Sequence, residues 1–84
     1  MKIYYTYILK CSDGTFYTWV TNDLDRRIIE HSEWLIYWSY THSRRPIKLM
    51  YHEEYCDIRD AIQREKQIKW WSRIKKQSLI DWTL

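Results

Sequence analysis

Five side chains in this sequence are of the types needed to cut a phosphodiester bond. Tyrosine or histidine can orient or deprotonate a water molecule, and arginine can hold a phosphate through two hydrogen bonds. A carboxylate can bind one divalent metal ion. The five residues are Tyr7, Tyr17, Arg27, His31 and Glu65. They could act together only if the fold brings them to one cleft.

Arg27 and His31 lie on what should be the packed face of a helix. A helix advances about 100° per residue, which places both residues in one arc with Leu24 and Ile28. Three other charged residues are expected to point elsewhere: Asp25, Arg26 and Glu30. The alternative is that Arg27 extends its charge to solvent and His31 is a hydrogen-bonded residue at the core boundary.

Glu65 is also a charged residue on the apolar face of a helix, one predicted from about Ile58 to Trp70. Its side chain lies near the middle of the apolar arc that contains Ala61 and Ile68. A carboxylate there is costly unless it meets a cation, hydrogen-bond donors or a metal ion. A salt bridge to an arginine inside the fold is the structural alternative. Charges on the buried faces of two separate helices favour a common cleft.

The two tyrosines are expected on neighbouring strands of a hairpin. The segments "IYYTYILKC" and "FYTWVT" are rich in β-branched and aromatic residues and flank the turn "SDGT". A three-residue loop ending at Gly14 would pair Leu9 with Tyr17 and Tyr7 with Trp19, with these side chains on one sheet face. A two-residue Asp-Gly turn would put Tyr7 and Tyr17 on opposite faces. We favour the three-residue loop.

The remaining pattern predicts one more strand and two more helices. Asn22 or Asp23 should cap the first helix, which runs to about residue 32, and residues 33–45 are expected to form an ordered loop. A third strand, "IKLMYHEEY", follows Pro46, and in it Leu49 and Tyr51 should share the apolar face.

Asp57 and Ser72 are the expected caps of the two last helices, with Asp60 completing a capping box. The predicted order is ββαβαα. The fold class is therefore α+β, a small three-stranded antiparallel sheet flanked by helices, and residues 1–84 are expected to form a single domain.

Composition limits the function classes. The formal charge of +3 permits a polyanionic partner without requiring one. Cys11 and Cys56 are too few for a disulfide scaffold, and the absence of a signal-like apolar start favours the cytoplasm and no membrane contact. The spacing of Cys and His does not suit zinc, and no glycine-rich phosphate loop is present.

Taken in order, these residues resemble the GIY-YIG nuclease superfamily, in particular its small stand-alone bacterial members. The first motif corresponds to Tyr5-Thr6-Tyr7 and the second to Tyr17-Thr18-Trp19. The segment "LDRRIIEH" is similar to the family helix that carries Arg and His, and "REKQIK" to the helix that carries the metal-binding glutamate. The resemblance covers nearly the whole chain and extends to the third strand and the final helix.

The resemblance implies single-metal hydrolysis of DNA, branched or damaged forms included. Tyr7 and Tyr17 would line the site, and one of them would help to activate the nucleophile. Arg27 would stabilise the phosphate, and His31 would position groups or transfer a proton. Glu65 would bind Mg²⁺ or Mn²⁺.

Three tryptophans depart from the family pattern. Trp19, Trp34 and Trp70 stand where that pattern has glycine, which suggests systematic replacement rather than drift. Glycine lets a backbone or substrate approach closely, so Trp19 could fill the cleft and abolish activity while the fold stays intact. The late asparagine that some family members place near the site also has no counterpart.

Two other functions compete with catalysis. A nucleic-acid-binding module would contact phosphates through basic side chains and stack bases on exposed tryptophans. The expected phosphate contacts are Arg44, Arg45, Lys66, Lys69 and Arg73. A self-associating structural protein would instead use its Trp-rich surface as an interface. The oligomeric state is not predicted.

Overall fold

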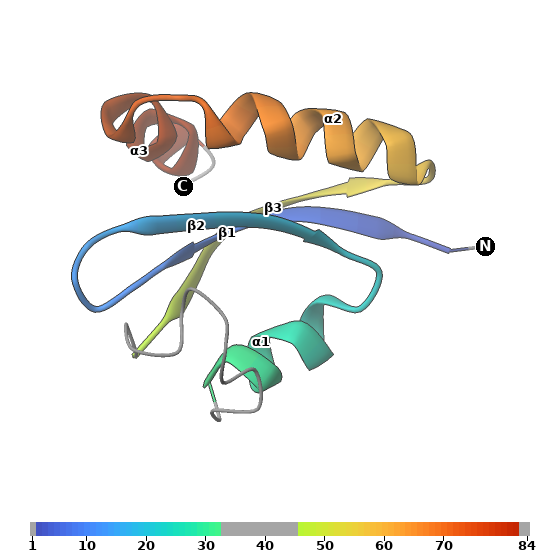
Figure 1. Ribbon diagram of the computed structural model, residues 1–84, viewed down its shortest axis with the longest axis horizontal. Coiled ribbons are helices and arrows are strands. Elements are labelled where there is room, and N and C mark those ends of the chain that lie inside the picture. Colours follow the sequence, from blue (N-terminus) through green and yellow to red (C-terminus); the bar gives the residue numbers. More distant parts are fainter. Residues whose placement is uncertain (1, 33–45, 83–84) are drawn as a thin grey trace.

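The computed structural model describes residues 2–32 and 46–82, and it has the predicted ββαβαα order. Three antiparallel strands form a sheet in the order β2-β1-β3. Helices α2 and α3 lie on one side of this sheet and α1 lies on the other (Figure 1). The α+β class is therefore confirmed. The element bounds are β1 Tyr4–Lys10, β2 Phe16–Thr21, α1 Leu24–Ser32, β3 Lys48–Tyr55, α2 Ile58–Lys69 and α3 Arg73–Trp82.

The β1–β2 hairpin has the predicted register. Gly14 has a φ of 85°, a left-handed conformation that glycine adopts without steric cost. Its N–H donates to the Cys11 carbonyl over 3.0 Å, and the Cys11 N–H donates to the Thr15 carbonyl over 2.9 Å. Tyr7 therefore pairs with Trp19, and Leu9 pairs with Tyr17. A single glycine thus decides which sheet face carries both tyrosines.

Each helix begins at a polar cap. Asp23 Oδ1 accepts from the Arg26 N–H over 3.2 Å, which selects Asp23 over Asn22 as the cap of α1. Asp57 Oδ1 accepts from the Arg59 N–H over 2.9 Å, and Ser72 Oγ accepts from the Lys75 N–H over 3.2 Å. Because α2 begins directly after Asp57, the face of the helix that carries Glu65 packs toward the sheet.

The core lies between the sheet and the pair α2 and α3. Ile8, Ile68 and Ile80 are buried and pack together, with Phe16 and Leu79 around them. Near the start of α2, the buried Thr6 hydroxyl donates to the Ala61 carbonyl over 2.7 Å. These contacts fix α2 against β1.

The apolar alternation expected in β3 is interrupted by a bulge. Ile8 pairs with Tyr51, but the next residue, Leu9, pairs with Leu49, so Met50 is the extra residue. Leu49 and Tyr51 therefore lie on opposite faces, and the expectation that they share one face is wrong. The bulge turns Tyr51 toward α2.

Behind this bulge, Glu53 links β3 to α2. Its carboxylate accepts three hydrogen bonds from two Arg64 donors: Nε donates to Oε1 at 3.0 Å and to Oε2 at 3.2 Å, and Nη2 donates to Oε2 at 3.1 Å. The hydroxyls of Tyr51 and Tyr55 also donate to it. Burial opposes the ionisation of Glu53, but these four donors outweigh it and lower the pKa of the carboxyl. Burial and the bond to Glu53 raise the pKa of Tyr51 to about 12.

We expect Glu53→Gln to lower the free energy of unfolding at pH 7 by about 1–3 kcal/mol, because Arg64 loses a half-buried ionic partner. The pKa of Glu53 is lower in the folded chain than its ordinary 4.5. Its stabilising contribution is therefore present above pH 4.5 and is lost as the pH falls through the folded value. Urea unfolding at pH 7 measures the loss of stability, and urea unfolding below pH 4.5 measures its pH dependence.

Glu54→Gln is the matched control, since this neighbouring carboxylate is exposed. It should change stability by less than about 0.5 kcal/mol. Equal acid sensitivity of the parent and Glu53→Gln would contradict the assigned role of Glu53.

Candidate functional site

Tyr7 and Tyr17 lie together on the sheet face that α1 covers. Tyr7 comes from the central strand and is fully buried, whereas Tyr17 comes from the edge strand β2 and is half-buried. Burial raises the pKa of both hydroxyls, and each also feels a nearby negative charge, Glu30 for Tyr7 and Glu65 for Tyr17. Both are therefore protonated at neutral pH and suited to donating hydrogen bonds.

Arg27 approaches the same face from α1. Its positive charge is close enough to favour ionisation of both Tyr7 and Tyr17, although burial dominates their pKa values. Its side chain is 39% exposed, and its Nε lies 3.9 Å from Glu30 Oε1. Arg27 is thus only loosely paired, and its guanidinium could turn to a bound phosphate.

Glu30 was expected to point away from the packed face, and that expectation is wrong. Its side chain is 23% exposed and lies within 3.9 Å of both Arg26 and Arg27. Its charge also raises the pKa of Tyr7. The spacing of Arg27 and Glu30, three residues apart on one helix, was the signal that could have found this contact.

Glu65 reaches the site from α2, on the other side of the sheet. It is only 6% exposed, and its charge contributes to the raised pKa of Tyr17. Lys69 Nζ lies 3.0 Å from Glu65 Oε1, an ion pair whose angles are not those of a hydrogen bond. The cation beside Glu65 is therefore a lysine one helical turn later, and not an arginine.

Trp19 covers the outer part of this face. Its ring stacks on Tyr17 with centroids 6.2 Å apart and an angle of 23° between the planes. It stays 41% exposed, and Lys69 Nζ lies 4.5 Å from its ring centroid. Trp19 therefore lies outside the core but contacts the candidate site. Its ring stacks on Tyr17, and the ammonium of Lys69, the ion-pair partner of Glu65, lies over it.

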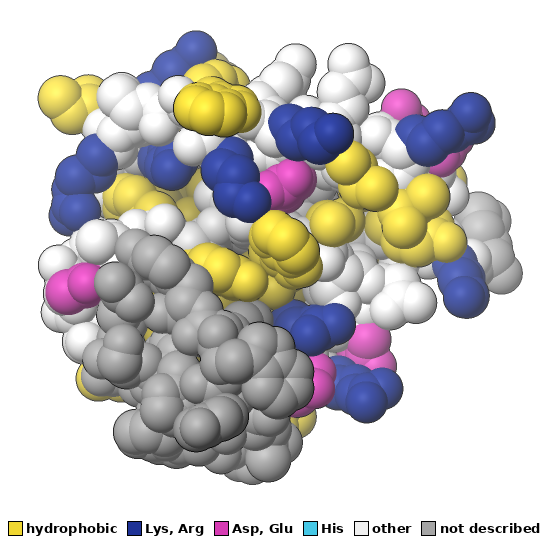
Figure 2. All heavy atoms as spheres, viewed as in Figure 1, with side chains coloured by type: hydrophobic (Ala, Val, Ile, Leu, Met, Phe, Trp, Pro, Cys, Tyr) yellow, Lys and Arg dark blue, Asp and Glu magenta, His cyan; other side chains and the backbone are white. Residues whose placement is uncertain are grey.

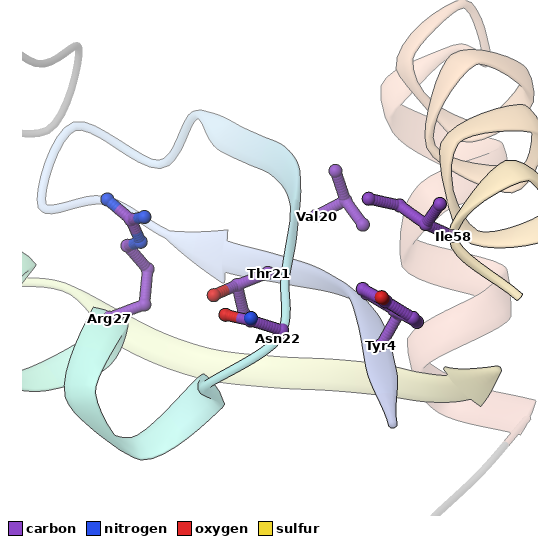
Figure 3. A pocket seen from close by; sticks show the side chains of 6 residues that line it. All are labelled: Tyr4, Val20, Thr21, Asn22, Arg27 and Ile58. Atoms are coloured by element: carbon purple, nitrogen blue, oxygen red, sulfur yellow. The ribbon is translucent and has the colours of Figure 1, made fainter. Parts of the chain in front are cut away.

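A cavity of about 220 Å³ opens beside Arg27 at the end of β2. Figure 3 shows Arg27 extending from α1 and Ile58 from α2 at opposite ends of the lining, with Thr21 and Asn22 between them. Val20 and Ile58 close the apolar end. The cavity is thus lined by the cationic side chain of Arg27 at one end and by a small apolar surface at the other.

A single magnesium-like ion would fit the residues present. Among the described residues there is no cluster of three or more His, Cys, Asp or Glu side chains that could enclose a metal. Mg²⁺ does not need such a cage, since it keeps several waters and binds one or two carboxylates together with substrate phosphate. Glu65 is a buried carboxylate whose Oε1 makes no hydrogen bond but has the Lys69 ammonium 3.0 Å away, so this oxygen already faces a cation.

Basic side chains surround the site on the helical side. Figure 2 shows Lys and Arg spread over the α2 and α3 region of the molecule. Five Lys and Arg residues of these two helices are exposed: Arg59, Lys66, Lys69, Arg73 and Lys75. The predicted contacts Arg44 and Arg45, Trp34 and the side chain of His31 lie outside the described residues. No helix in the described ranges is long and apolar enough to cross a membrane.

Comparisons with known proteins identify the family of the chain. Residues 3–78 match the family model of the GIY-YIG catalytic domain. The chain is 42% identical over 78 residues to a UPF0213 protein of Bacillus pumilus, covering 93% of this chain and 79% of that one. It is also 42% identical over 80 residues to one from Staphylococcus saprophyticus, covering 95% and 96%.

A solved structure has the same fold. The solution structure of the UPF0213 protein BH0048 from Bacillus halodurans superimposes with a TM-score of 0.61 at 37% identity. The match covers 94% of this chain and 83% of that chain. The similarity therefore extends through the whole sheet and its helices.

Proposed function

Because this chain belongs to the GIY-YIG catalytic domain family, we propose that it is a metal-dependent endonuclease that hydrolyses DNA phosphodiester bonds. One observation carries the proposal. Tyr7, Tyr17, Arg27 and Glu65 come from four separate elements. Tyr7 and Tyr17 share one sheet face, the charge of Arg27 favours ionisation of both tyrosines, and the charge of Glu65 opposes ionisation of Tyr17. Side chains that share an electrostatic environment and are individually costly to bury are typical of active sites.

In this proposal, Arg27 holds the scissile phosphate. Its guanidinium can form two parallel hydrogen bonds to phosphate oxygens and oppose the negative charge that develops in the transition state. The loose contact with Glu30 at 3.9 Å leaves it able to do so.

The tyrosines orient the attacking water. Tyr7 and Tyr17 keep their protons at neutral pH, so their hydroxyls donate hydrogen bonds or pass a proton along rather than acting as permanent bases. Glu65 would hold Mg²⁺ or Mn²⁺, which when bound supplies Lewis acidity and lowers the pKa of water. Trp19 narrows access to the same face and is expected to slow the reaction.

Nicking of supercoiled plasmid tests the proposal. We expect purified protein to relax plasmid slowly with Mg²⁺ or Mn²⁺ and not at all with EDTA. Glu65→Gln should lower the rate by at least about 100-fold, since it removes the ligand charge while keeping the shape. Glu54→Gln makes the same chemical change at an exposed position and should cleave like the parent. Cleavage that survives Glu65→Gln would refute Glu65 as the metal ligand.

The exposed cations favour a second candidate, a non-catalytic nucleic-acid-binding module. Lys75 Nζ lies 4.3 Å from the ring centroid of the half-buried Trp71, next to Arg73 and Lys76. Such a surface binds phosphates with an affinity that falls steeply with salt. Folded parent and Trp19→Gly proteins that bind DNA in this way, yet never cleave it, would establish the module in place of the nuclease.

A further inference from the structure

Lys69 lies beside Glu65, the residue that would hold a metal ion in the proposed function. Its ammonium lies 3.0 Å from Glu65 Oε1, at a spacing of four residues along α2. The Glu65 side chain is 8% exposed, whereas that of Lys69 is 50% exposed. The carboxylate is therefore fixed in the fold, and the lysine is the partner that can move away.

One further contact, with the Trp19 ring, keeps Lys69 at this position. The ammonium lies 4.5 Å from the centroid of the Trp19 ring, within the range of an attractive cation–π contact. Lys76 lies close by, and its pKa is lowered by burial and then by the charge of Lys69. A second positive charge near the first makes the surroundings of Glu65 unfavourable for an added divalent cation.

From this geometry we propose that Lys69 competes with the metal ion for Glu65 and sets the metal affinity of the site. The inference rests on the proposed function, in which Glu65 is the metal ligand. In the metal-free protein, Lys69 neutralises the buried carboxylate. Metal binding requires the ammonium to leave Oε1, and the exposed half of its side chain lets it move into solvent. Removing the ammonium therefore strengthens metal binding, in contrast to the usual loss when a residue beside a metal site is replaced.

Mn²⁺ titration of the folded protein without DNA tests this competition, with calorimetry or the loss of the free-ion paramagnetic resonance signal as the readout. Lys69→Met keeps most of the unbranched side chain and removes the charge. It should lower the dissociation constant for Mn²⁺ by on the order of tenfold, the scale on which groups around a metal site act. Lys69→Gln serves as a second neutral variant, and Lys69→Arg keeps the charge and should stay near the parent.

Lys66→Met controls for the general loss of one positive charge from α2. Lys66 is exposed and only one residue from Glu65, so its removal should change the Mn²⁺ affinity by less than about twofold because solvent screens it. Unchanged or weaker Mn²⁺ binding in both Lys69→Met and Lys69→Gln would overturn the competition. If Glu65→Gln then loses Mn²⁺ binding, Glu65 is still the metal ligand and only the competition with Lys69 is refuted. If Glu65→Gln still binds Mn²⁺, Glu65 is not the metal ligand.

Discussion

Trp19→Gly is expected to cleave supercoiled plasmid about 10- to 100-fold faster than the parent. The indole is 41% exposed on the face that carries Tyr7 and stacks on Tyr17 with ring centroids 6.2 Å apart. A DNA backbone bound at both Arg27 and Glu65 would pass the edge strand β2, where the indole lies beside Tyr17 and Lys69. Misplacing a substrate by about 1 Å can cost 100-fold in rate, so removing the obstruction should recover a factor of that size.

The gain should appear in the initial rate of relaxation at saturating Mg²⁺. Glycine inside a strand lowers stability by about 0.5–1 kcal/mol, so the assay temperature must keep both proteins folded. Trp70→Gly is the matched control, because Trp70 follows α2, is 87% exposed and should not change the rate. An unchanged or slower rate in Trp19→Gly would show that the indole does not obstruct the site.

Arg27→Ala is expected to lower the single-turnover cleavage rate by about 100- to 1,000-fold, the usual cost of losing one donor to a developing negative charge. Arg27 is the arginine whose charge reaches both Tyr7 and Tyr17. Arg27→Lys should fall between the parent and Arg27→Ala, because lysine keeps the charge and loses the planar two-bond geometry.

Arg26→Ala is the matched control for this prediction. Arg26 contacts Glu30 at the same 3.9 Å, but its side chain is 75% exposed. It should cleave within about twofold of the parent. If Arg26→Ala and Arg27→Ala lose activity equally, the effect is the loss of general positive charge on α1, and Arg27 has no special place at the phosphate.

The sequence was sufficient for the parts of the fold that depend on local chemistry. Gly14 predicted the turn and, through it, the register that puts Tyr7 and Tyr17 on one face. Asp57 and Ser72 predicted where α2 and α3 begin. The low exposure of Glu65 followed from its position among the apolar residues of α2.

Contacts between separate helices and strands could not be predicted from the sequence pattern. The bulge at Met50 depends on how β3 pairs with β1, and the Glu53–Arg64 ion pair depends on where α2 crosses β3. Lys69 was predicted only as a phosphate contact. Its ion pair with Glu65 is a local i,i+4 pair, but its importance comes from the burial of Glu65 and the approach of Trp19, which only the tertiary structure shows.

Whether Arg27 and Glu65 serve one reaction at one phosphodiester is tested most directly by combining their variants. Single-turnover cleavage is measured with Mg²⁺ for Arg27→Ala, Glu65→Gln and the protein carrying both, in whichever of the parent and Trp19→Gly cleaves faster. Residues that act in the same step are strongly non-additive. We predict that the double variant cleaves no more than about twofold more slowly than the slower single variant. Losses that multiply, to about 10,000-fold when each single variant loses about 100-fold, would mean that the two residues act independently and would contradict a single site built around β2.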